Sequence, residues 1–168
     1  SAKYYAEIHG DYKASEHFPS VQDVWDWGFD NTFNTVLPQR VVSETLRVKK
    51  EFPDKSVIAH FMQPHIPMLG EPPLTLEVWE YCSDSRLNPQ LCPVEDIFSK
   101  GYGEYFIRAY EGNLRLALKE VERLVSSWDG KIVITADHGE GFGENGAFGH
   151  YAGVKISELV EVPFFELP

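Results

Sequence analysis

Residues 131–150 read KIVITADHGEGFGENGAFGH. The stretch begins with a short β-branched run, residues 131–136, whose flanks are polar. This pattern predicts a strand that is buried in a sheet between two neighbours. Asp137 and His138 follow at its carboxyl end, where open α/β sheets place their ligands. We therefore expect the ligand site of the fold to lie at this strand end.

A glycine-rich loop follows the Asp137-His138 pair. Glycine occupies positions 139, 141, 143, 146 and 149, and residues without a Cβ let the backbone approach a bound ion or anion closely. A carboxylate beside an imidazole suits a divalent cation such as zinc or manganese. Taken alone, the pair is equally compatible with an aspartate that caps a turn and a histidine that packs.

A second candidate site residue is His65. It follows residues 56–62, SVIAHFM, which predict a strand apolar enough for burial in a parallel sheet. Pro64 and Pro67 flank His65, and prolines restrict the backbone around them. A rigid loop that presents an imidazole has the preorganisation that a substrate contact needs. The alternative for His65 is a purely structural turn.

Two segments have the pattern of helices. Residues 38–52 begin with a proline, which suits a first turn, and carry basic residues late, where the helix dipole favours them. Residues 105–128 repeat apolar side chains at intervals of three and four. The repeating apolar residues of this second helix are Phe106, Tyr110, Leu114, Leu118, Val121, Val125 and Trp128. The polar residues expected to face outward are Asn113, Arg115, Lys119, Glu120 and Glu122.

The order of these elements predicts the fold class. Residues 70–100 are proline-rich with little periodicity and suggest an inserted excursion that shapes access to the site. Residues 156–161 predict a short helix, and residues 162–167 predict a last edge strand. We expect a single α/β domain, 1–168, with a mostly parallel sheet, crossover helices and functional loops at one rim. If the strands predicted at residues 56–62 and 131–136 are neighbours in the sheet, His65 lies in the same site as Asp137 and His138.

Composition limits the possible partners. The formal net charge of -11 and the pI near 4.9 leave no basic patch for phosphates, so we expect no nucleic-acid partner. No apolar run approaches the ~20 residues that span a bilayer, and the start has no signal-peptide pattern. We therefore expect a cytoplasmic protein without a membrane span.

Cys82 and Cys92 either pair in a surface loop or stay free thiols. The oligomeric state is left open.

Three segments carry a resemblance to a known family. These are TADHGEGFGE at residues 135–144, Gly149-His150, and ELVEVP at residues 158–163. Together they resemble the carboxyl-terminal metal motif of the alkaline phosphatase and sulfatase superfamily. The HFMQPH segment at residues 60–65 is similar to that of short archaeal-type sulfatase-like proteins. The resemblance covers the chain from about residue 38 onward and implies an alkaline-phosphatase-like fold.

The resemblance implies a role for four residues. Asp137 and His138 match the pair that binds a catalytic divalent cation, which here would be zinc, manganese or calcium. His65 matches a histidine of sulfatases and lipoteichoic-acid-synthase-like phosphotransferases that contacts a sulfate or phosphate oxygen. His150 falls near a basic position where many sulfatases have lysine. It would therefore either contact the substrate or bind a second metal.

The chain departs from the family pattern in one respect. No strand ends in an aspartate followed by a Ser, Thr or modified Cys nucleophile, and Cys82 lacks the Pro-x-Arg context of a modified cysteine. The resemblance implies a metal-dependent hydrolase or transferase of small-molecule sulfate or phosphate esters, incomplete as far as this sequence goes. One alternative is a non-catalytic metal-binding or anion-binding domain, and another is a structural domain with a vestigial Asp-His pair.

Overall fold

The computed structural model describes residues 13–75, 93–151 and 153–168. The chain divides into two compact units, Ser1–Met62 and Gln63–Pro168, and each is described by itself. Cys82 and Cys92 lie outside the described residues. The prediction of a single domain stays a prediction.

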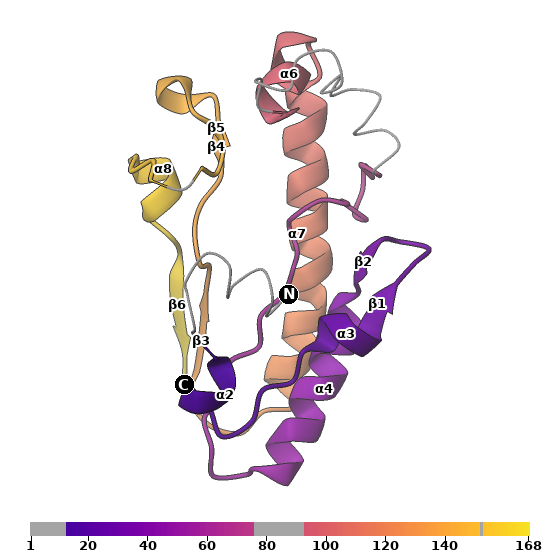
Figure 1. Cartoon of the computed structure of the whole chain (residues 1–168), viewed down its shortest axis with the longest axis vertical. Coiled ribbons are helices and arrows are strands. Elements are labelled where there is room, and N and C mark those ends of the chain that lie inside the picture. Colours follow the sequence, from indigo (N-terminus) through magenta and orange to yellow (C-terminus); the bar gives the residue numbers. More distant parts are fainter. Residues whose placement is uncertain (1–12, 76–92, 152) are drawn as a thin grey trace. The chain divides into compact units, whose positions relative to one another are not determined.

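The first unit is mainly helical and contains a small antiparallel hairpin (Figure 1). In the hairpin, Phe29 pairs with Val36 and Asp30 pairs with Thr35. The Oδ1 atom of Asp30 accepts hydrogen bonds from the backbone N–H groups of the turn that follows, which is the usual way an aspartate closes a turn. The elements of this unit are α2 (Ala14–His17), α3 (Val24–Gly28), β1 (Phe29–Asp30), β2 (Thr35–Val36) and α4 (Pro38–Glu51).

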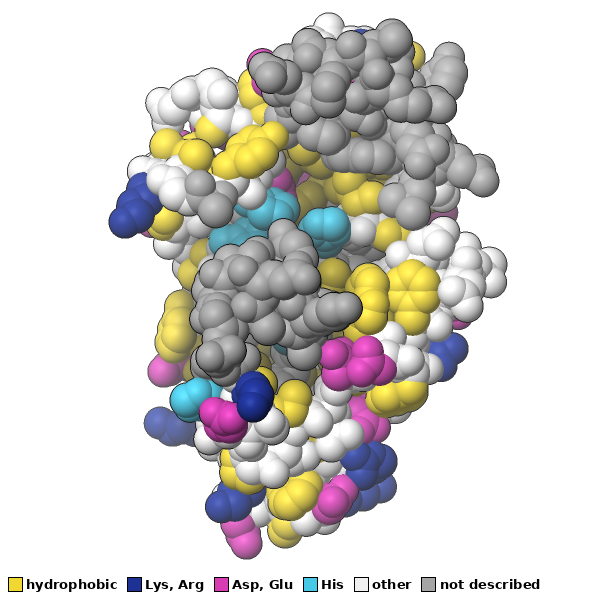
Figure 2. Space-filling view, viewed as in Figure 1, with side chains coloured by type: hydrophobic (Ala, Val, Ile, Leu, Met, Phe, Trp, Pro, Cys, Tyr) yellow, Lys and Arg dark blue, Asp and Glu magenta, His cyan; other side chains and the backbone are white. Residues whose placement is uncertain are grey.

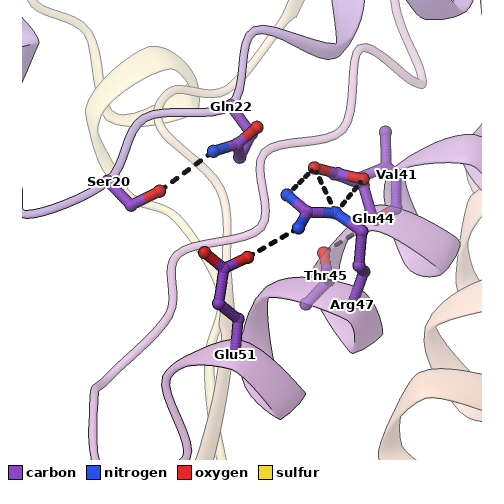
Figure 3. Close-up of polar contacts among 7 residues, drawn as sticks. All are labelled: Ser20, Gln22, Val41, Glu44, Thr45, Arg47 and Glu51. Atoms are coloured by element: carbon purple, nitrogen blue, oxygen red, sulfur yellow. Dashed lines mark hydrogen bonds and ion pairs between the residues drawn. The ribbon is translucent and has the colours of Figure 1, made fainter.

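Helix α4 matches the helix predicted at residues 38–52 and begins at Pro38 as expected. Its side carries a three-residue ion network, drawn in Figure 3. Arg47 Nη2 donates to Glu44 Oε1 at 2.7 Å and Arg47 Nη1 donates to Glu51 Oε2 at 2.6 Å. The hydrogen bonds from Arg47 lower the pKa of Glu44 below its usual value, because they stabilise the carboxylate. These pairs connect successive turns of the helix.

In the described residues of the second unit, the long helix α7 is followed by two pairs of short strands, a 3-10 turn and a short helix (Figure 1). Its apolar core joins the long helix α7 to α6 and to the loop after residue 63, and aromatic rings of the glycine-rich loop pack against this core. The buried core residues are Met68, Leu74, Val94, Ile97, Phe106 and Ala109. The elements are α6 (Pro93–Ser99), α7 (Gly103–Ser126), β3 (Ile132–Thr135), β4 (Gly141–Phe142), the 3-10 turn Glu144–Gly146, β5 (Phe148–Gly149), α8 (Ser157–Val160) and β6 (Phe164–Leu167).

Helix α7 forms where the apolar periodicity predicted it, but two of its polar residues do not face outward. Asn113 is 0% exposed and Glu120 is 6% exposed. The Glu120 carboxylate pairs with the Arg123 guanidinium one turn later, and the Asn113 side chain bonds to a loop that is far away in the sequence. Periodicity alone could not place these two side chains, because a polar residue is buried only when a specific partner satisfies it.

The strand pairing differs from the expected pattern. The strand at residues 131–136 forms as β3, and the predicted last strand forms as β6, but the two pair with each other in antiparallel register. The side chains of β3 alternate between half-buried and exposed, where we had predicted burial. Residues 56–62, predicted as a strand, contain none. All three strand pairs of the described residues are antiparallel, and the parallel sheet stays a prediction.

The physical reason for the exposure of β3 is its environment. Among the described residues, β6 is the one strand that pairs with β3. The two strands therefore form a ribbon that is not part of a larger sheet. Val133 on β3 and Phe164 on β6 are 47% and 67% exposed.

Within the residues that the structure describes, no helix combines the length and apolar composition needed to cross a bilayer.

Candidate functional site

The loop that carries His65 is attached to helix α7 through Asn113. The amide Nδ2 of Asn113 donates to the backbone oxygens of Pro64 and His65, each at 3.1 Å. Its Oδ1 accepts from the backbone N–H of Leu69 at 3.0 Å. One fully buried side chain therefore satisfies backbone groups on both sides of the loop and fixes the position of His65 relative to α7.

Two glycines allow this loop to lie close to the helix. A Cβ on Gly70 would fall 2.1 Å from the backbone carbon of Gly112. A Cβ on Gly112 would fall 2.5 Å from the backbone oxygen of Glu71. Both distances are far below van der Waals contact, so side chains at these two positions would push the loop away from α7. The glycines and Asn113 together build the support of His65.

Asp137 and His138 lie directly after β3, as the sequence predicts. Their side chains are 64% and 44% exposed, so neither is enclosed in the core. The Asp137 Oδ1 atom accepts from the backbone N–H of His138 at 3.1 Å, which orients the carboxylate. The Nε2 atom of His138 lies 3.8 Å from Asp137 Oδ2, so both atoms border the same small volume. Gly139 N then donates to Leu159 O at 2.9 Å and anchors the loop on α8.

His150 follows β5 and is paired with Glu140. The His150 Nδ1 atom lies 2.9 Å from Glu140 Oε2, and the Glu140 side chain is only 12% exposed. This hydrogen bond raises the pKa of His150 above its usual value. Burial opposes the rise, and the charges of Glu140 and Asp137 add to it. His150 therefore keeps a proton more readily than a free imidazole, which suits contact with an anion.

The imidazoles of His65, His138 and His150 form one cluster. The ring centroids of His138 and His150 are 4.3 Å apart, and those of His65 and His150 are 6.0 Å apart. Figure 2 shows histidine side chains side by side above the middle of the displayed face, and histidine also appears apart from them at the lower left. The structure therefore brings three of the four predicted site residues into ring contact, and the fourth, Asp137, is bonded to His138.

Each of the three imidazoles is oriented by a hydrogen bond at its Nδ1 atom. His65 Nδ1 lies 2.9 Å from Ile66 O, His138 Nδ1 lies 2.8 Å from Gly139 O, and Glu140 holds His150 Nδ1 in the same way. Because each of these oxygens can only accept, each Nδ1 carries a proton. The Nε2 atom is thus the ring nitrogen left for a ligand, as in histidines that contact metals or substrates.

The fit of these residues to a cation is partial. Among the described residues no three His, Cys, Asp or Glu side chains group closely enough to hold a metal ion. Asp137 and His138 nevertheless offer a carboxylate oxygen and an oriented imidazole on one edge, which is the donor chemistry that zinc or manganese takes. The pair supplies two ligands, and a cation held there needs further donors, which water or other residues would supply.

A pocket adjoins the histidine cluster. Its volume is about 220 Å³. The charged and imidazole side chains in its lining are those of His65, Glu140 and His150. The remainder of the lining is largely apolar and includes Ile66, Met68, Val94, Phe106 and Tyr110. A small molecule with a polar head and an apolar body matches this division.

Two residues of this site were not singled out by the sequence. Glu140 stands in the motif without an assigned role, and its pairing with His150 joins positions ten residues apart in a loop of unpredictable shape. Tyr110 fits the apolar repeat of α7, and this repeat gives no reason to expect a role for its hydroxyl. The one available signal is that a tyrosine in an apolar stripe carries a hydroxyl that needs a hydrogen-bond partner.

No protein-family model, curated protein or solved structure matches this chain. The resemblance to the alkaline phosphatase and sulfatase superfamily therefore stays a prediction from the motifs.

Proposed function

We propose that this chain belongs to a metal-dependent hydrolase or transferase that acts on small-molecule sulfate or phosphate esters. The observation that supports the proposal is the meeting of His65 with His138 and His150, because their segments are far apart in the sequence. An exposed Asp137 beside this cluster provides an anionic cation ligand. Imidazoles grouped around a cation are suited to tetrahedral oxyanions.

Each residue has a separate task in the proposed mechanism. Asp137 and His138 would hold the cation, and a cation bound there would supply positive charge to neutralise the non-bridging oxygens of the ester. His65 Nε2 contacts an ester oxygen from a loop that Asn113 holds in place. His150, oriented by Glu140, stabilises developing charge or gives a proton to the leaving group. The proposal leaves the nucleophile unassigned, because no residue of this sequence matches the family pattern for it.

The first prediction separates the cation ligands from the substrate contact. We expect Asp137→Ala to weaken manganese or zinc binding at least about 100-fold, since a direct ligand should cost no less than an outer-shell partner. We expect His65→Ala to keep the metal and to lose affinity for inorganic phosphate. Calorimetric titration and elemental analysis measure the two properties, and Asp129→Ala, an exposed aspartate before β3, is the matched control.

Equal loss of metal in Asp137→Ala and His65→Ala would contradict the role given to His65. Hydrolysis of 4-nitrophenyl sulfate and 4-nitrophenyl phosphate with added manganese, zinc or calcium tests the reaction itself. Metal binding with turnover supports the hydrolase. Metal binding without turnover, both in this chain and in a longer one that supplies the unassigned nucleophile, points to the alternative, a non-catalytic metal-binding or anion-binding domain. No metal binding at all would reject both and support a structural domain.

A further inference from the structure

The pocket beside the histidine cluster contains a hydroxyl that the proposed mechanism does not use. Tyr110 lies on α7, and its ring packs edge-on against Phe142 of β4, with centroids 5.2 Å apart and an interplanar angle of 80°. The same side chain lines the pocket together with His65, Glu140 and His150. Packing against Phe142 holds the ring, so the side chain has a defined position in the lining of the pocket.

The Tyr110 hydroxyl has no hydrogen-bond partner within the described residues. Tyr105, one turn earlier on the same helix, behaves differently, since its hydroxyl donates to Pro73 O at 2.5 Å. A half-buried phenol normally finds an acceptor. Among the described residues, the Tyr110 hydroxyl is therefore a donor that is available to a ligand in the pocket.

The surroundings keep this hydroxyl protonated. Burial, together with the nearby carboxylates of Glu140 and Asp137, raises the pKa of Tyr110 to about 12. At neutral pH the group therefore has an O–H to donate.

We propose that the Tyr110 hydroxyl donates a hydrogen bond to an oxygen of the sulfate or phosphate ester that His65 and His150 contact. Tyr110 is then a substrate-binding residue contributed by helix α7, in addition to His65 and His150, which are contributed by loops. This inference rests on the proposed function. A bound anion accepts from donors only, and the phenol adds such a donor beside the imidazoles without adding a charge.

The test uses the whole chain with manganese and two probes, inorganic phosphate and phenyl phosphate. Phenyl phosphate is chosen because the lining of the pocket also includes the apolar side chains of Ile66, Met68 and Phe106. We expect Tyr110→Phe to weaken binding of both probes about 10- to 100-fold, the usual effect of losing a hydrogen bond to a charged group. The control is Tyr105→Phe, which loses a structural hydrogen bond and should keep the affinity for both probes.

Three results would overturn the inference. Unchanged phosphate affinity in Tyr110→Phe would reject the role of the hydroxyl and leave the proposed function in place. Weaker binding of phenyl phosphate alone would mean that Tyr110 packs against the organic group and does not bind the anion. Absence of phosphate binding by the wild-type chain would reject the proposed function as well.

A second measurement does not depend on a variant. In the wild-type chain, the Cζ resonance of Tyr110 should shift as inorganic phosphate is added, because a phenol that begins to donate changes its ring carbon. A resonance that stays in place at saturating phosphate would contradict the inference even if Tyr110→Phe were poorly folded.

Discussion

Asn113 shows how much one buried side chain contributes to the candidate site. It is 0% exposed, and its amide connects helix α7 to backbone atoms of Pro64, His65 and Leu69. Removal of the amide would leave these backbone groups unsatisfied inside the protein, and each such group costs about 1–3 kcal/mol. Asn113 therefore links stability to the placement of His65.

We predict that Asn113→Leu lowers the free energy of unfolding by about 2–4 kcal/mol and also weakens phosphate binding, because the His65 loop loses its attachment. Arg115→Leu is the matched control, since Arg115 is exposed on the same helix and should change stability by less than about 0.5 kcal/mol. Urea unfolding and phosphate titration measure the two effects. Similar stability of the two variants would show that the loop is held by other contacts.

At the scale of an element, the ion network of helix α4 contributes to stability. Its network connects Arg47 with Glu44, whose side chain is 11% exposed, and with Glu51, whose side chain is 52% exposed. The less exposed pair is screened less by solvent and should contribute more to stability. The lowered pKa of Glu44 expresses this preference for the charged form in the folded state.

The sign of the pH effect follows from that shift. Because the folded-state pKa of Glu44 lies below the unfolded value, the stabilisation is present above the unfolded pKa and is lost as pH falls through the folded pKa. We predict that Glu44→Gln is less stable than the wild type at pH 7, by about 0.5–1 kcal/mol, and that the difference disappears in acid. Denaturant unfolding at several pH values between 3 and 7 measures this.

Glu51→Gln serves as the comparison, because it removes the more exposed partner of the same arginine. It should change the unfolding free energy less than Glu44→Gln does at pH 7. A Glu44→Gln deficit that persists unchanged at pH 3 would mean that packing of the side chain, and not its charge, carries the effect.

For the molecule as a whole, net charge governs how cations and anions approach. The formal charge is -11, whereas the proposed site must admit an anionic ester. The attraction of a divalent cation by this charge would reverse the local field near Asp137 and so prepare the site for the anion. All the candidate site residues lie in the second unit, Gln63–Pro168.

We predict that raising ionic strength from about 10 to about 150 mM weakens manganese binding about 3- to 10-fold, because the Debye length falls from about 30 to about 8 Å. Calorimetric titration at several salt concentrations measures this change. If the affinity does not depend on salt, then Asp137 and His138 alone determine cation binding and the net charge has no part in it.

The extent to which the sequence predicts the candidate site differs from residue to residue. The positions of Asp137, His138 and His150 follow from local motifs, since a strand end and a glycine-rich loop are recognisable in the sequence. The partner of His150 was not predictable, because Glu140 reaches it through the fold of a loop whose glycines allow many backbone conformations. The role proposed for the Tyr110 hydroxyl was not predictable either, since the apolar repeat of α7 accounts for the tyrosine ring.

By itself the sequence determined helices α4 and α7 and the strands β3 and β6 at their approximate positions, because apolar periodicity, β-branched runs and proline are local signals. Only the tertiary structure decided that β3 pairs with β6 in antiparallel register, that Asn113 is buried, and that three imidazoles meet. Strand partners and buried polar contacts join residues distant in the chain. Their free energy depends on which surfaces come together, and no local pattern encodes it.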